Sequence, residues 1–232
     1  MLTYSMNVII VSLVGGLLCL DRVVLQTAVC RPIVAAPLLG WLLGDAYTGL
    51  VAGAFLELFW IDRLPLGTYI PPNETVVAIL TAAGAILAGR ALGSLPPALI
   101  TLAVLLFLPL GIAAQQLERW HCRRNERAAL AALADAGRGD GWAIARRHRL
   151  AILRYYSLAT GLIVVALPLG VLVLSWGFPR LPGFATRGLT LLYGVLPLIG
   201  CAAALQTIPV RRAVPIFCAL FLVSASLLAW WR

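Results

Sequence analysis

The chain consists largely of apolar stretches, and this pattern restricts it to the folds of membrane-spanning proteins. Their approximate bounds are 6–20, 32–44, 46–61, 70–89, 95–115, 155–177 and 188–231, the last divided near "TIPVRR". Hydrophobic residues make up 62% of the chain, charged residues 12%, and the mean hydropathy is +0.96. These values lie outside the range of soluble domains. The sequence therefore predicts an all-α, polytopic integral membrane protein.

Two of the stretches, 32–44 and 46–61, are too short to cross a bilayer singly, because a straight span needs about 20 residues. The polar turn "GDAYTG" joins them. Half-helices survive at membrane depth only when they are buried in protein or line a cavity. We expect a re-entrant helical hairpin here. Residues 6–20 follow no basic region and precede no clear cleavage site, which predicts a retained membrane segment and not a signal peptide.

The hydrophilic segment 116–154 holds nine of the 18 Arg residues and four of the nine acids. The chain has no Lys and a net charge of +9. By the positive-inside rule this segment faces the cytoplasm, so membrane orientation explains the charge better than nucleic-acid binding. Asn125 is expected to cap a short amphipathic helix near the headgroups that ends at Gly137.

This basic loop divides the chain into an N-terminal membrane region (1–115), the cytoplasmic loop (116–154) and C-terminal membrane helices (155–232). From the loop the chain is expected to cross outward over 155–177 and to return over 188–207. The pair Arg211-Arg212 then lies inside, and the last helix ends outside.

Glu57 is an acid inside an apolar stretch. Glycines occupy positions 40, 44, 49 and 53, and Gly49, Gly53 and Glu57 share one helix face. The glycines permit close helix approach, and the carboxylate points into the interface. One interpretation is that the glycine strip only packs helices and that a neighbouring group pairs with the acid. The other is that Glu57 binds the hydroxyls of a solute. An ionisable group in a membrane segment is costly, and such groups are therefore candidates for function.

The motif "PPNE" precedes the next apolar stretch. Pro71 and Pro72 remove backbone donors and keep the chain extended, so Asn73 can cap the following helix with Glu74 in its first turn. The motif is either simply a helix start or a site at which Asn73 and Glu74 offer amide and carboxylate groups to a ligand.

Four polar residues interrupt the segment "LDRVVLQTAVCRPIVAAPLLGWLLGD": Asp21, Gln26, Arg31 and Asp45. Arg31 precedes a proline at the start of a predicted half-helix. It is expected to pair with Asp45 or Asp21, or to reach an interface by snorkelling. Asp21, Arg31 and Asp45 are therefore candidates for structural or gating roles.

Groups for covalent chemistry are missing from the sequence. It has no nucleotide-binding loop, Walker lysine, nucleophile elbow or clustered metal ligands, so neither a metal nor a cofactor is expected. The five Cys residues are scattered and suggest core hydrophobes. His121 and His148 lie among Arg residues, where we expect solvated or headgroup-facing roles. The chain is expected to move a solute without catalysing a reaction.

Together, "RPIVAAPLLGWLLGD", "TGLVAGAFLELFW" and "PLGTYIPPNETVVAI" resemble, in order and spacing, the membrane IIC subunit of the mannose/fructose/sorbose family of the bacterial phosphoenolpyruvate-dependent sugar phosphotransferase system. The resemblance covers about residues 15–90. It implies that Glu57 and Asn73 lie in the region associated with sugar, and that Gln26 corresponds to the Gln or Glu that precedes the "RP" element in relatives.

The resemblance also implies a function and partners. Such a subunit is a multi-pass protein of the inner membrane that carries no phosphorylated residue. It acts with a membrane IID subunit, as a homo-oligomer of IIC–IID units, and with cytoplasmic IIA and IIB phosphocarriers. A hexose or amino sugar would cross the assembly and be phosphorylated by phospho-IIB. The alternatives are a non-transporting scaffold or sensor and a proton-coupled transporter in which Glu57 relays protons.

Overall fold

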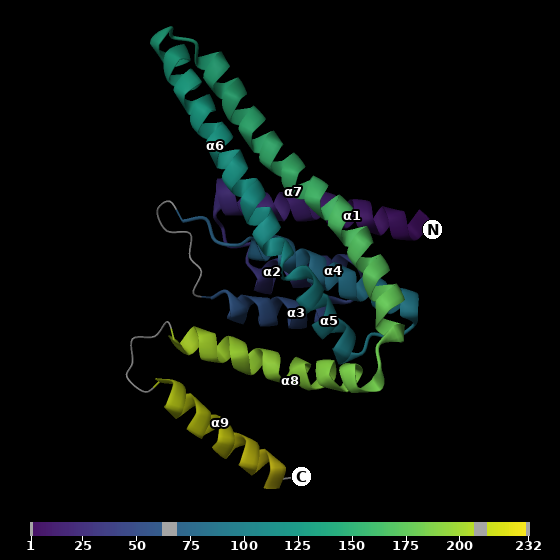
Figure 1. Ribbon diagram of the computed structural model, residues 1–232. Coiled ribbons are helices and arrows are strands. Elements are labelled where there is room, and N and C mark those ends of the chain that lie inside the picture. Colours follow the sequence, from purple (N-terminus) through teal and green to yellow (C-terminus); the bar gives the residue numbers. More distant parts are fainter. Residues whose placement is uncertain (1, 62–68, 207–212, 231–232) are drawn as a thin grey trace.

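A computed structural model describes residues 2–61, 69–206 and 213–230, and in this part of the chain helices joined by short turns form the whole fold, with no strand (Figure 1). In chain order the elements are α1 (Leu2–Leu20), η1 (Asp21–Leu25, a π-helical turn), α2 (Pro32–Leu42), α3 (Ala46–Phe59), α4 (Glu74–Leu92), α5 (Pro97–Phe107), α6 (Leu110–Gly137), α7 (Gly141–Gly177), η2 (Phe178–Arg180), α8 (Gly183–Gln206) and α9 (Ala213–Trp230). The prediction of an all-α fold is confirmed.

Helix α4 is the centre of the packing. Its residues from Glu74 to Gly89 are buried, and it contacts α1, α2, α3, α5, α6 and α7. Its sequence is apolar or small on every side, which is typical of a helix enclosed by others. Phe107 of α5 fills the space over Gly84, where an added Cβ would lie 2.5 Å from its ring, and the same ring packs against Gly170 of α7. These two glycines let α5 fit between α4 and α7.

Helices α2 and α3 form the expected hairpin, with the most extensive contact between any two elements. Their 11 and 14 residues extend about 16 and 21 Å at 1.5 Å per residue. Both are shorter than the hydrocarbon core of about 30 Å. A Cβ at Gly49 would lie 2.5 Å from the carbonyl oxygen of Ala36, and one at Gly53 would collide with that of Pro32. The predicted glycine strip therefore sets the distance between the two helices.

Segment 116–154 is a helical hairpin, not the loop with one short helix that the sequence predicted. Helix α6 continues unbroken to Gly137 and α7 returns from Gly141, and together they project from the helical body (Figure 1). The expectation that Asn125 caps a helix was wrong, because no Gly or Pro separates Gly111 from Gly137 and the helix has no reason to stop. The predicted end at Gly137 is confirmed.

Five helical segments of the described chain are long and apolar enough to cross a membrane. They are Thr3–Leu25, Glu74–Leu92, Pro97–Gly137, Gly141–Arg180 and Gly183–Leu205. Helix α8 packs on α3 and α5 but buries only 6% of its apolar window, and α9 contacts α8. The predicted cytoplasmic pair Arg211-Arg212 lies outside the described residues. A large apolar surface of α8 is left for lipid or a partner.

The glycine strip yields a matched pair of substitutions. Gly53→Ala should force α2 and α3 apart, because the new Cβ collides with the backbone of Pro32. A lower melting temperature in detergent is the expected result. Gly161→Ala is the control, since nothing lies within 4 Å of its Cβ in α7. That change should be neutral or stabilise by up to about 1 kcal/mol. Equal melting temperatures for the two variants would contradict close packing in the hairpin.

Candidate functional site

Five polar side chains gather at the N-terminal end of α4. They are Arg22, Asn73, Glu74, Glu118 and Tyr155, here called the Arg22 cluster. Arg22 Nη1 lies 2.6 Å from Glu74 Oε2, and its Nε lies 3.5 Å from Glu118 Oε1. The Asn73 amide and the Tyr155 hydroxyl each donate to Glu118 Oε1 at 2.6 Å. The cluster thus joins η1, α4, α6 and α7.

The local sequence explains how Asn73 is positioned. The prolines before it exclude helix, and Asn73 begins α4 as its N-cap, accepting from the Val76 N–H at 3.0 Å. The predicted cap is confirmed. Its own N–H donates to the Gly111 carbonyl at 3.0 Å, and the Gln115 amide donates to the Ile70 carbonyl. The motif is therefore fixed to α6, and the Asn73 amide group is directed at Glu118.

The charges of the Arg22 cluster do not balance. One guanidinium faces two carboxylates, and the side chains of Arg22, Glu74 and Glu118 are 8, 9 and 10% exposed. Burying charge is costly unless it is paired and hydrogen-bonded. The donors from Asn73 and Tyr155 offset part of the remaining negative charge on Glu118. A cavity of about 20 Å³ beside Asn73, Glu118 and Tyr155 has room for about one water molecule.

A second ion pair joins α2 to α3. Arg31 donates from Nε to Glu57 Oε1 at 2.7 Å, its Nη2 donates to the same oxygen, and the Ile33 N–H donates to Oε2 at 3.3 Å. Glu57 therefore points into the helix interface, as the glycine spacing predicted. The expectation that Arg31 pairs with Asp45 or Asp21 was wrong, because Asp45 lies at the far end of the hairpin and other groups occupy Asp21.

Asp21 organises the turn between η1 and α2. Its Oδ1 accepts from the Thr27 N–H at 2.9 Å and the Thr27 hydroxyl at 2.6 Å, and its Oδ2 accepts from the Cys30 N–H at 3.0 Å. The Cys30 carbonyl in turn accepts from the Thr75 hydroxyl at 2.8 Å. Through these contacts the turn links η1 and α2 to the first turn of α4.

Gln26 and Asp45 are not in the Arg22 cluster. Gln26 adopts a left-handed conformation with φ of 55°, and its side chain is exposed on the Asp21 turn. Asp45 is the N-cap of α3, where its Oδ1 accepts from the Thr48 N–H at 3.0 Å and its Oδ2 from the Thr48 hydroxyl at 2.6 Å. Asp45 has a structural role, and that of Gln26 stays a prediction.

Sequence reasoning missed Arg22, Glu118 and Tyr155. Arg22 stands beside Asp21 at the end of an apolar helix, where it resembles an interfacial charge, and Glu118 falls in a hydrophilic segment, where solvation is the ordinary expectation. The solvated or headgroup-facing role expected for His121 was also wrong. His121 is 3% exposed, packs edge-on against Tyr155 at 5.4 Å and contacts the Asn125 amide at 2.8 Å.

Comparison with known families identifies the family of the chain. The model of the family described as "PTS system sorbose-specific iic component" matches residues 5–229. The chain belongs to this family. The match extends far beyond residues 15–90, which carry the resemblance in the sequence motifs. Together with the five candidate spans, it makes this IIC chain an integral membrane protein.

Curated relatives match this IIC chain over most of its length. The mannose-specific EIIC component of Escherichia coli (strain K12) is 23% identical over 95% of this chain and 80% of its own. The sorbose-specific EIIC component of Klebsiella pneumoniae is 26% identical over 85% and 71%. The N-acetylgalactosamine permease IIC component 2 of E. coli K12, whose name is a provisional one, is 44% identical over 59 residues, which are 25% of this chain and 44% of that protein.

Solved structures share the fold. A chain of the cryo-EM structure titled "Mannose Transporter ManYZ and Microcin E492 (MceA) complex" superposes with a TM-score of 0.61 at 22% identity, covering 97% of this chain and 87% of that one. A chain titled "Structure of membrane protein" gives a TM-score of 0.72 at 21% identity, covering 95% and 85%.

The ion pair between Arg22 and Glu74 can be tested by a double-mutant cycle. Arg22→Gln leaves two buried carboxylates without their counter-charge and should cost about 3–5 kcal/mol of stability. The double variant Arg22→Gln/Glu74→Gln removes one of those charges and should recover part of the loss. Thermal unfolding of the four proteins in detergent gives the coupling. Strictly additive effects would show that the pair contributes nothing.

Proposed function

We propose that this IIC chain is the sugar-translocating subunit of an inner-membrane phosphotransferase system, and that its substrate is a hexose or amino sugar. The observation that carries the proposal is the Arg22 cluster, a buried set of carboxylates and donors inside a chain of this family. The names of the relatives, which specify mannose, sorbose and N-acetylgalactosamine, support this class of substrate.

The cluster has the chemistry that sugar hydroxyls need. Each hydroxyl both donates and accepts, so a sugar is held best by carboxylates next to N–H and O–H donors. Glu118 and Glu74 supply acceptors, while Arg22, Asn73 and Tyr155 supply donors. Bonds to charged groups contribute about 1.5–3 kcal/mol each, which suits recognition of a neutral solute.

The observed conformation is closed at this site. Asn73 and Tyr155 already occupy Glu118 Oε1, and the cavity beside them admits little more than one water. A sugar would replace these contacts with its own hydroxyls, which requires the start of α4 to separate from α6 and α7. During transport, on this proposal, the hydrogen bonds that Asn73 and Tyr155 donate to Glu118 are replaced by hydrogen bonds to the sugar.

Phosphoryl transfer on this proposal belongs to partner subunits. The carboxylates and donors of the Arg22 cluster are suited to binding a sugar. A IID-like membrane subunit and IIA and IIB phosphocarriers complete the system, with phospho-IIB phosphorylating the sugar as it emerges. The apolar exposed surface of α8 supports a membrane partner, and assembly as several IIC–IID units is part of the proposal.

Reconstitution tests the function directly. Membranes that contain this chain with IID, IIA and IIB partners should phosphorylate a sugar in a phosphoenolpyruvate-dependent reaction. Glu118→Gln removes the charged acceptor at constant size and should lower the rate at least about tenfold. Glu126→Gln, on an exposed position of the same helix, should keep the wild-type rate. If no phosphorylated sugar forms although all partner proteins are phosphorylated, the proposed function is rejected. If the Glu118→Gln variant keeps the wild-type rate, the Arg22 cluster is rejected as the sugar site.

Glu57 is the second candidate for sugar contact. Glu57→Gln loses the ion pair with Arg31 and the charged acceptor, while α2 and α3 retain their glycine packing. We expect sugar transport to be lost although the chain still inserts and binds IID. Uptake of labelled sugar is compared with membrane-fraction immunoblots and with co-purification of IID. Unaltered uptake would remove Glu57 from the proposed site.

A further inference from the structure

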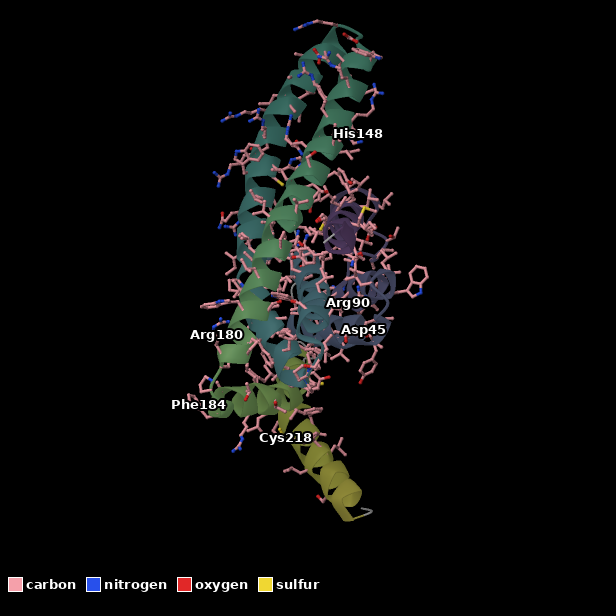
Figure 2. All side chains as sticks on the ribbon, turned by 90° about the vertical axis from the view of Figure 1, so that its right-hand side faces the viewer. Asp45, Arg90, His148, Arg180, Phe184 and Cys218 are labelled. Carbon is pink, nitrogen blue, oxygen red and sulfur yellow. The ribbon has the colours of Figure 1, made fainter. Side chains whose placement is uncertain are left out.

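A cleft that contains two charged side chains opens at the other end of α4, away from the Arg22 cluster. Its volume is about 330 Å³. The residues that line it come from the α2–α3 turn and from the last turn of α4 with the chain that follows: Gly44, Asp45, Ile86, Gly89, Arg90, Gly93, Ser94 and Leu95. Figure 2 looks onto this end of the molecule, with Asp45 and Arg90 close together. Unlike the cavity at the Arg22 cluster, this space is wide enough for more than a water molecule.

The charged groups of the cleft have unused hydrogen-bonding capacity. An ionised carboxylate offers about four lone-pair sites, and Asp45 uses two of them on Thr48. A guanidinium carries five donors, and no ion pair or side-chain hydrogen bond joins Arg90 to another described residue. Acceptors and donors therefore both face the same space.

Glycine keeps the cleft open. Gly44 and Gly93 take left-handed backbone conformations, with φ of 76° and 73°, which end α2 and α4 and disfavour side chains at these positions. A Cβ at Gly44 would lie 3.5 Å from Arg90 Nη2, in contact with the guanidinium. Both glycines are exposed where they line the cleft, beside the two charged side chains.

The cleft faces the outside of the membrane on the predicted topology. Helix α4 has 19 residues and spans about 28 Å, close to the thickness of the hydrocarbon core. The basic hairpin leaves the body next to Glu118 and Tyr155, so that end of α4 is the cytoplasmic one. Asp45 and Arg90 then lie at the outer surface, where a solute arrives.

We propose that this cleft is an outer encounter site for the transported sugar, with Arg90 donating to sugar hydroxyls and Asp45 accepting from them. The inference rests on the proposed function and extends it to a second site. Asp45 and Arg90 together give a net charge of zero, which favours a neutral polyhydroxyl compound over a phosphate or another anion. The sugar would meet this site first and reach the Arg22 cluster after the helices rearrange.

Protection of a cysteine from a membrane-impermeant maleimide tests the site. Ser94→Cys places a thiol on the exposed rim, in a background where Cys122, Cys201 and Cys218 are replaced by Ser. In intact cells the maleimide should label this thiol, and external mannose, fructose, sorbose or N-acetylgalactosamine should slow the labelling. Arg180→Cys is the control, because Arg180 is exposed at the same end but away from the cleft (Figure 2).

The outcomes separate this inference from the function itself. Labelling slowed by one sugar at Ser94→Cys, and not at Arg180→Cys, supports the site. Arg90→Gln in the same background should then weaken protection about tenfold, and Arg90→Lys less. Labelling that no sugar slows, or that needs permeabilised cells, overturns it. Labelling of the thiol does not depend on phosphoryl transfer. If a sugar protects Ser94→Cys but is not phosphorylated, only the proposed function is rejected. If the sugar is phosphorylated but does not protect Ser94→Cys, only the cleft is rejected as a sugar site.

Discussion

The ion pair of Arg22 with Glu74, and its approach to Glu118, determines how η1, α6 and α7 meet the start of α4. A charge this deeply buried persists only when its partners are fixed in place. Asn73 and Tyr155 contribute the donors that Glu118 needs, and this brings α6 and α7 to the start of α4. The same contacts therefore close the helical body and form the candidate sugar site, so that opening the site and loosening the body are one event.

Close packing of small residues supports this arrangement. The glycines of α2 and α3 let the two helices touch backbone to backbone, and Gly84 and Gly170 admit the ring of Phe107 between α4 and α7. Tight apolar contact of this kind holds the hairpin and α5 in register with α4. The charged side chains around α4 can then lie at its two ends, away from the apolar residues in its middle.

The two ends of α4 differ in a way that suits transport. At the Arg22 cluster the polar groups are paired with one another and the cavity is small, while at the other end of α4 Arg90 has capacity to spare and the cleft is open. In this conformation the cleft beside Asp45 and Arg90 is the more open of the two. On the proposed function, a sugar held outside would favour a rearrangement that breaks the inner contacts, since its hydroxyls replace them.

The sequence by itself determined the all-α membrane architecture, the short α2–α3 hairpin, the glycine face and the Asn73 cap, because each depends on hydropathy or on neighbours close in the chain. It could not place Glu118 or His121, since helix α6 carries them from a hydrophilic segment into the packed body. It also assigned Arg31 the wrong partner. Tertiary packing decides which charges from distant segments pair, and it sets the positions of Arg22, Glu74 and Glu118. The reason is that an Arg can choose among several acids until helix contacts bury some of them beside it and desolvation makes pairing necessary.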